Sequence, residues 1–223
     1  MTSPGAMPSG APAGGEAPPP DERATHPDPL TPPTPLNRLH GLLLVVLGGA
    51  GLYGAFALAV DKYKILEDPT FSPSCDLNPV LSCGTVMVTE QGSVFGFPNP
   101  LIGLMAFAVV LTLGVLVAGG VALPRWALAG LAGGSLLGVV FVHWLAFQSL
   151  YRIGALCPWC LVVWTVTLAI FVWSALLAAR SVPALARVAG AVWSVRYLVL
   201  TFWYLGFVTA ALVRFWDYWR TLL

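Results

Sequence analysis

The sequence predicts an all-α integral membrane protein whose transmembrane helices form a bundle. The 223-residue chain is 57% hydrophobic and only 9% charged, whereas a soluble domain carries about 25% charged residues. Its mean hydropathy is +0.80. Five apolar segments approach the roughly 20 residues that a helix needs to cross the hydrocarbon core of a bilayer. The formal net charge of +1 gives no electrostatic footprint for nucleic acid.

Residues 1–37 are predicted to form a disordered tail. They hold 11 of the 19 prolines, together with many Gly, Ala and Ser residues. Such a segment cannot bury enough apolar surface to offset the entropy lost on ordering. A proline-rich ligand for an SH3-like partner is the weaker interpretation, so the folded part of the chain is expected to begin near residue 38.

The five predicted spans cover residues 39–60, 101–118, 126–150, 156–179 and 197–213. The third span is rich in glycine, which we expect at close contacts between helices; these glycines are Gly130, Gly133, Gly134 and Gly138. Residues 180–196, which include three arginines, are expected to form a loop before the fifth span that is partly helical and lies at the membrane interface. The aromatic and basic residues after that span are typical of a membrane interface.

The longest polar connection, residues 61–99, holds the first cysteine pair, Cys75 and Cys83. Their spacing lets the two sulfurs meet across one helical turn or an irregular hairpin. The segment 92–100, Gly-Ser-Val-Phe-Gly-Phe-Pro-Asn-Pro, is apolar but too short and too interrupted by Gly and Pro to cross a bilayer. We expect it to lie as a cap over the helix ends.

The second cysteine pair, Cys157 and Cys160, lies in the motif Cys-Pro-Trp-Cys that opens the fourth span. At a helix N-terminus, the first sulfur faces free backbone N–H groups and the positive end of the helix dipole, which favours thiolate. Thiolate is the nucleophile of disulfide exchange. Because two spans separate the cysteine pairs, both pairs are predicted to lie on the same side of the membrane.

The orientation in the membrane follows from two weak signals. Six basic residues against five favour a cytoplasmic N-terminus by the positive-inside rule. Disulfides persist on the extracytoplasmic side. We therefore expect a multi-pass protein of the cell membrane (inner or plasma), with its cysteine pairs on the extracytoplasmic face.

Three interpretations of the four cysteines compete. A zinc site is the weakest, because the Cys-x7-Cys half is a poor zinc pattern. Static disulfides are stronger, although a disulfide within Cys-Pro-Trp-Cys closes too small a loop to stabilise the fold much. A working redox relay accounts best for both pairs. Its natural electron acceptor in a lipid phase is a lipid-soluble quinone, since the sequence contains no haem, flavin or nucleotide-binding motif.

Four sequence features occur together in a fixed order: Cys75-Asp76, Ser82-Cys83, Phe-Gly-Phe-Pro-Asn-Pro entering the second span, and Cys-Pro-Trp-Cys opening the fourth. Over about residues 40–180 the chain resembles bacterial members of the vitamin K epoxide reductase family. The resemblance implies a four-helix bundle around a quinone, a cap from the first loop, and a fifth helix. It also implies a functional counterpart of DsbB, which reoxidises a DsbA-like thioredoxin-fold protein and reduces menaquinone, ubiquinone or a vitamin K-like quinone.

By position, the resemblance also implies a direction for the electrons. Cys75 takes them from the thiols of the partner and exchanges with Cys83. Cys83 exchanges with Cys157, and Cys160 faces the quinone and attacks its ring. Because no thioredoxin domain follows the fifth span, we expect the partner to act in trans.

The resemblance implies quinone-binding roles for Asn99, Thr89 and Trp164, in addition to Cys160. Trp164 stands where some family members have a tyrosine. It can donate an N–H but cannot accept as a phenol does, which argues against epoxide chemistry. Asp76 is a supporting residue beside the first cysteine.

His143, within the third span, is the other supporting candidate. It has two interpretations: a proton relay for quinone reduction, or a neutral histidine hydrogen-bonded between helices. The expected organisation is a tail (1–37), a catalytic bundle (38–180, with the cap loop 61–99), and a loop with the fifth helix (181–223). The alternatives to a thiol oxidase are a vitamin K quinone or epoxide reductase proper, and a non-enzymatic membrane protein with static disulfides.

Overall fold

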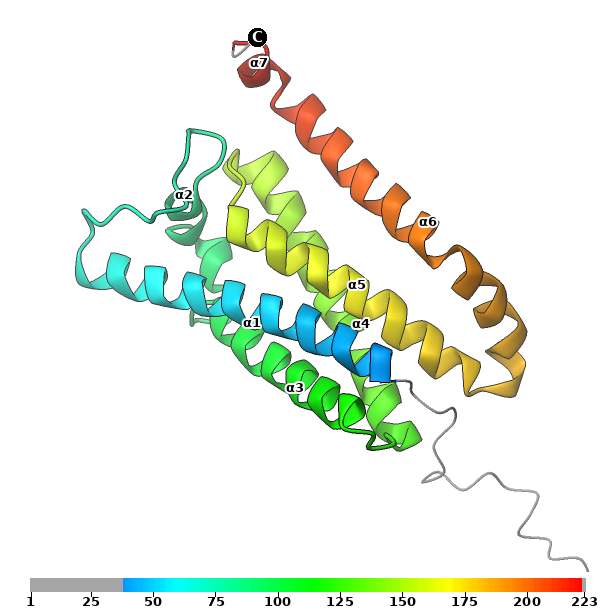
Figure 1. The fold of residues 1–223 in the computed structure, drawn as a ribbon. Helices are drawn as coiled ribbons and strands as arrows, with labels where there is room; N and C mark the ends of the chain where they lie inside the picture. The colour runs from blue at the N-terminus through cyan, green and yellow to red at the C-terminus, as the bar shows by residue number, and fades with distance from the viewer. Residues whose placement is uncertain (1–37, 222–223) are drawn as a thin grey trace, which may run out of the picture.

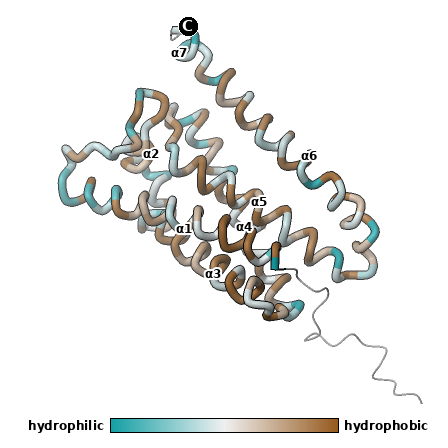
Figure 2. Tube along the Cα trace, in the orientation of Figure 1, coloured by the Kyte–Doolittle hydropathy of each residue, from teal (hydrophilic) through white to brown (hydrophobic). Residues whose placement is uncertain are grey.

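The computed structural model describes residues 38–221, and this part of the chain is almost entirely helical (Figure 1). Its five long helices are α1 (Arg38–Glu67), α3 (Pro100–Ala118), α4 (Arg125–Gln148), α5 (Pro158–Arg180) and α6 (Pro183–Arg214). Each is long and apolar enough to cross a membrane, with α4 continued by the π-helical turn η3 (Ser149–Ile153). Hydrophobic residues are frequent along these helices, whereas the last turns of α1 carry several hydrophilic residues (Figure 2). The predicted fold class is confirmed, while the predicted tail, residues 1–37, lies outside the described residues.

Helix α5 is the centre of the packing, because it lies against α1, α4 and α6. Helix α1 in turn packs closely on α3. Helix α6 therefore lies on the outer side of α5 (Figure 1). Helices α3 and α4 make few direct contacts with each other. This leaves space inside the bundle between α3 and α4.

Glycines let α1 and α3 approach each other closely. A Cβ atom on Gly114 of α3 would lie 2.8 Å from the backbone nitrogen of Val45, and one on Gly48 of α1 would lie 3.0 Å from that of Leu111. Side chains at these positions would push the helices apart. The tight helix pair of this bundle is therefore α1–α3.

The expectation that the glycines of the third span make close helix contacts is wrong for three of them. A Cβ atom on Gly130, Gly133 or Gly134 would meet nothing within 4 Å, and only Gly138 approaches another helix, at 3.2 Å from Thr167. The physical reason is that α4 does not pack on α3. Its glycines leave open space instead of closing it.

The loop expected at residues 180–196, with partial helix, is helical from Pro183 onward. Pro183 occupies the first turn of α6, where the missing N–H of proline costs nothing, and the helix continues to Arg214. Arginine is a good helix former, and Arg196 stacks on Trp193 and Tyr197, at 4.5 and 4.4 Å from their ring centroids. The first span likewise runs past its predicted end, because residues 61–67 continue α1.

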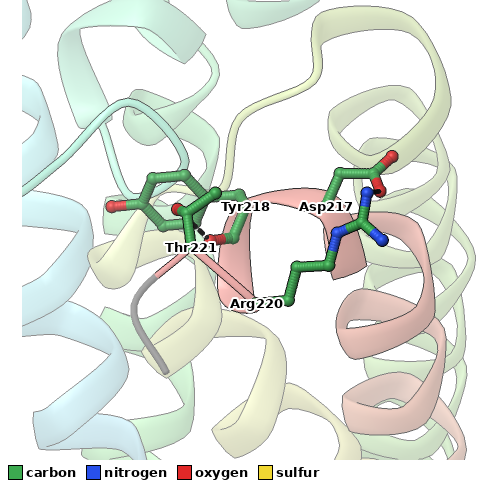
Figure 3. Close-up of polar contacts among 4 residues, drawn as sticks. All are labelled: Asp217, Tyr218, Arg220 and Thr221. Carbon is green, nitrogen blue, oxygen red and sulfur yellow. Dashed lines mark hydrogen bonds and ion pairs between the residues drawn. The ribbon is translucent and has the colours of Figure 1, made fainter.

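The C-terminal end of the described chain lies near the cap loop and the start of α5 (Figure 1). Helix α7 (Trp216–Trp219) follows Phe215, which packs in a buried cluster with Val80 of the cap loop and Leu156. Figure 3 shows the polar contacts of this end: Arg220 pairs with Asp217, and the Thr221 hydroxyl donates to the Tyr218 carbonyl. The ion pair is exposed and contributes little to stability.

Candidate active site

The cap loop holds Cys83 in place through the carboxylate of Asp76. This carboxylate accepts hydrogen bonds from the Ser82 hydroxyl (3.0 Å) and the Gly84 backbone N–H (2.8 Å). Ser82 is also the N-cap of the short helix α2 (Cys83–Met87), and its oxygen accepts from the Thr85 N–H. Charge-assisted bonds of this kind are about twice as strong as neutral ones. Asp76 therefore closes the loop between Cys75 and Cys83 and fixes the start of α2.

Cys75 and Cys83 form a disulfide, and we call them the outer pair. The Cα atoms of the two residues lie 5.7 Å apart. Cys83 is fully buried, whereas Cys75 is 7% exposed. The sulfur nearer to the surface is therefore that of Cys75, and the sulfur facing the protein interior is that of Cys83.

A two-bond β-bridge clamps the cap loop onto the segment before α5. The Ser82 N–H donates to the Leu156 carbonyl (2.9 Å), and the Leu156 N–H donates to the Val80 carbonyl (2.7 Å). Residues that are more than 70 positions apart in the chain are thereby held side by side. Ser82 precedes Cys83 and Leu156 precedes Cys157, so the bridge sets the distance between these two cysteines.

Cys157 and Cys160, which we call the inner pair, lie at the N-terminus of α5. Cys157 is the N-cap residue and Pro158 begins the helix, and the backbone N–H of Cys160 donates to the Cys157 sulfur (3.4 Å). The Cys157 sulfur lies 3.2 Å from that of Cys83. This separation lies within the near-attack range of about 3–3.5 Å. Thiol–disulfide exchange between the outer and inner pairs therefore needs no large movement of the chain.

The surroundings of Cys157 favour its ionised form. A hydrogen bond from the Cys160 thiol lowers the pKa of Cys157, and the backbone N–H groups of Cys160 and Trp159 lower it further. Burial and the charge of Asp76 oppose this effect. A thiol with a lowered pKa leaves more readily as a thiolate, so Cys157 is a good leaving group in exchange with Cys83.

An apolar cavity of about 660 Å³ lies inside the bundle. The inner pair lines it, and its walls come from α1, α3, α4 and α5. Gly134 of α4 lines it, as do Val109 of α3 and Trp126 of α4, which are both more than half exposed. The cavity therefore opens between α3 and α4, toward the region that lipid would occupy.

Besides Cys160, two of the predicted quinone-binding residues line this cavity, Asn99 and Trp164. Asn99 is buried, its amide N–H₂ donates to the Gln91 carbonyl (2.7 Å), and its amide oxygen accepts from the Val94 N–H. One N–H of that amide is left for a ligand, since an –NH₂ group carries two donors. Trp164 is only 6% exposed, and its indole N–H has no hydrogen-bond partner among residues 38–221. A buried donor without a partner is costly, which makes Trp164 a candidate for binding a ligand in this cavity.

Thr89, another predicted quinone-binding residue, lies away from the cavity wall. Thr89 precedes the 3₁₀-helix η2 (Glu90–Ser93), and its hydroxyl donates to the Val86 carbonyl (2.7 Å). It does not line the cavity, so the structure gives no support to the quinone-binding role that the resemblance implied for it.

His143 also lies outside the cavity lining. Its Nδ1 lies 2.7 Å from the Val139 carbonyl, and the Trp203 indole N–H donates to its Nε2 (2.8 Å). A carbonyl only accepts and an indole N–H only donates, so these partners require a neutral ring protonated on Nδ1. Of the two interpretations of this residue, the arrangement favours the neutral histidine that joins two helices, α4 and α6.

Sequence reasoning missed two ionisable residues at the end of α1, where residues 61–64 were interpreted only as the end of a span. The Lys62 ammonium donates to the Met87 carbonyl (2.7 Å) and lines the cavity. A carboxylate oxygen of Asp61 lies 3.9 Å from the Cys75 sulfur. The sequence signal that could have found them is helical periodicity. Extending the first helix through residues 61–67 brings Asp61 and Lys62 next to the cap loop.

Comparison with known proteins points to a family whose sequence model covers these site residues. A search of curated proteins found none that matches this chain. The sequence model of the vitamin K epoxide reductase family matches residues 42–175, more than half of the chain. The matched range holds both cysteine pairs, Asn99 and Trp164. The chain therefore belongs to the vitamin K epoxide reductase family.

Proposed function

We propose that this protein oxidises the dithiol of a DsbA-like thioredoxin-fold protein, which acts in trans, and passes the electrons through its two cysteine pairs to a quinone. Membership of the family implies, more generally, a membrane oxidoreductase that links disulfide chemistry to a quinone. The observation that carries the proposal is the 3.2 Å contact between the Cys83 and Cys157 sulfurs. Static disulfides give no reason for this contact between the pairs.

The relay uses successive thiol–disulfide exchanges. A thiolate of the partner attacks Cys75, and Cys83 leaves as a thiolate. Cys83 then attacks Cys157 of the oxidised inner pair, and Cys160 leaves as a thiolate at the cavity wall. The second thiolate of the partner attacks its own mixed disulfide and releases Cys75. Finally, Cys75 attacks Cys83 and releases Cys157, so that two electrons have reached the inner pair.

The cavity fits a quinone in shape and chemistry. Its lining is largely apolar, and it opens between α3 and α4. It also contains the indole N–H of Trp164 and one N–H of Asn99, neither of which has a partner within residues 38–221. These two donors suit the carbonyl oxygens of the ring and would stabilise negative charge on them. A bound quinone supplies a two-electron acceptor. Cys160 lines the same cavity and delivers the electrons, while Cys157 closes the inner disulfide behind it.

The proposal includes an orientation and an organisation of the chain. The cysteine pairs face the extracytoplasmic side of the cell membrane, where a DsbA-like partner works, and the N-terminus is cytoplasmic. Residues 38–180 form the catalytic bundle. Helix α6 packs on α5 and supports it from the outside, and its role in the reaction is indirect.

Quinol formation by the reconstituted protein tests this function. The protein in lipid, supplied with menaquinone or ubiquinone and a reduced thioredoxin-fold protein, is expected to give one quinol for each partner disulfide formed. Quinol is measured by its ultraviolet absorbance, and partner thiols are counted by alkylation. Absence of quinol with every candidate partner would contradict the proposal. Turnover of vitamin K epoxide without oxidation of a protein partner would favour the reductase alternative.

A further inference from the structure

Asp61 lies at the end of α1, directly beside the outer cysteine pair. Its Oδ2 atom is 3.9 Å from the Cys75 sulfur. In the disulfide this sulfur carries no proton, so it offers the carboxylate no hydrogen bond. In the reduced pair the same two atoms are placed for an S–H···O bond. The contact can therefore act as a hydrogen bond only when Cys75 is a thiol.

The charged groups around Asp61 are held by partners of their own. The Cys75 thiol is therefore the neighbour with which the Asp61 carboxylate can exchange a proton. Lys64 and Asp76 act on Asp61 through their charges, but the Lys64 ammonium lies over the Phe71 ring, 5.2 Å from its centroid. The Lys62 ammonium donates to a backbone carbonyl. The Asp76 carboxylate is held by Ser82 and Gly84 in the cap loop.

We propose that Asp61 holds the proton of Cys75 after the partner has released this cysteine, and accepts that proton when Cys75 attacks Cys83. This inference rests on the proposed relay. A negative charge beside Cys75 favours its thiol over its thiolate. At this stage of the relay Cys83, which is buried against Cys157, is the sulfur that Cys75 attacks. Cys75 is prevented from returning the electrons to the partner.

The last exchange of the relay, in which Cys75 attacks Cys83, balances without any further reactant. Cys75–SH attacks the Cys83 sulfur of the Cys83–Cys157 disulfide, and the Cys75–Cys83 bond forms as the Cys83–Cys157 bond breaks. Cys157 leaves with the electron pair as a thiolate, and Asp61 receives the proton from Cys75. Because Asp61 is half-buried at the end of the helix, it can release this proton to water.

The test isolates Cys75 as the single outer thiol in a Cys83→Ala background. The rate of its alkylation by iodoacetamide is followed against pH by mass spectrometry of the Cys75 peptide, without quinone or partner. Adding Asp61→Asn is expected to raise the rate at neutral pH about tenfold, because the thiolate fraction increases when the adjacent charge is lost. Asp61→Glu keeps the charge and is expected to retain slow alkylation.

Glu67→Gln is the matched control, since it removes a carboxylate from the same end of α1 at an exposed position. It is expected to leave the alkylation profile unchanged. Identical profiles for the Asp61→Asn protein and its parent would overturn the inference, and so would an equal effect of Glu67→Gln. The measurement requires no electron transfer, so a failure of the proposed relay in the quinol assay would be seen separately.

Discussion

Replacing Cys160 with alanine is expected to reduce quinol formation on the order of a thousandfold or more, because a covalent nucleophile is removed. Cys160 lines the cavity, and the inner disulfide cannot form without it. The outer pair is left intact by this change. A reduced partner should therefore still exchange with Cys75 and lose its thiols in a single turnover, without producing quinol. Quinol absorbance and partner alkylation, measured on the same sample, separate the two half-reactions.

Thr165→Ala is the matched control for this variant. Thr165 lies on the same helix but is exposed, and its hydroxyl bonds only to the backbone carbonyl of Leu161. Quinol formation by that protein is expected to stay close to the parent rate. Normal turnover by the Cys160→Ala protein would sink the proposed electron path.

Gly134→Leu is expected to raise the KM for a quinone with a long isoprenoid tail by about tenfold, because the new side chain fills the part of the cavity between α3 and α4. Gly134 lines this cavity, and a Cβ atom there meets no other atom within 4 Å, so the fold accepts the change. The loss of a few buried methylene contacts by the tail accounts for an effect of this size, at about 0.8 kcal/mol for each methylene. Initial rates with long-tailed and tail-less quinones measure it.

Gly133→Leu supplies the control, because Gly133 is the adjacent residue, has equally open surroundings, and does not line the cavity. Its protein should resemble the parent with both quinones. The tail-less quinone should also be reduced normally by the Gly134→Leu protein, since the inner pair and Trp164 are unchanged. Equal loss with both quinones would show that Gly134 does not lie along the path of the tail.

The sequence was sufficient to predict the membrane fold and the motifs that carry the chemistry. Apolar segment length is a strong signal, because only a helix satisfies its own backbone in a bilayer. The start of α5 could be placed from Cys-Pro-Trp-Cys, since proline favours the first helical turn. Counting spans put both cysteine pairs at one end of the bundle, where the structure has them.

The remaining features depend on contacts between segments that are distant in the chain. The β-bridge between Leu81 and Leu156 has no local sequence signal, because each strand is a single residue. The contact of Asp61 with Cys75 depends on how far α1 extends beneath the cap loop. The glycines of α4 were assigned to helix packing because composition does not distinguish a glycine at a helix contact from one that lines a cavity.

Disulfide formation between Cys83 and Cys157 tests the central claim most directly. In a Cys75→Ala/Cys160→Ala protein, these two residues are the remaining cysteines, and their sulfurs lie 3.2 Å apart. Mild oxidation is expected to join them nearly completely, as seen by mass spectrometry of the linked peptides. A Cys75→Ala/Cys157→Ala protein, which keeps Cys83 and Cys160, should form much less of the corresponding bond. Free Cys83 and Cys157 thiols after oxidation would contradict a relay between the two pairs.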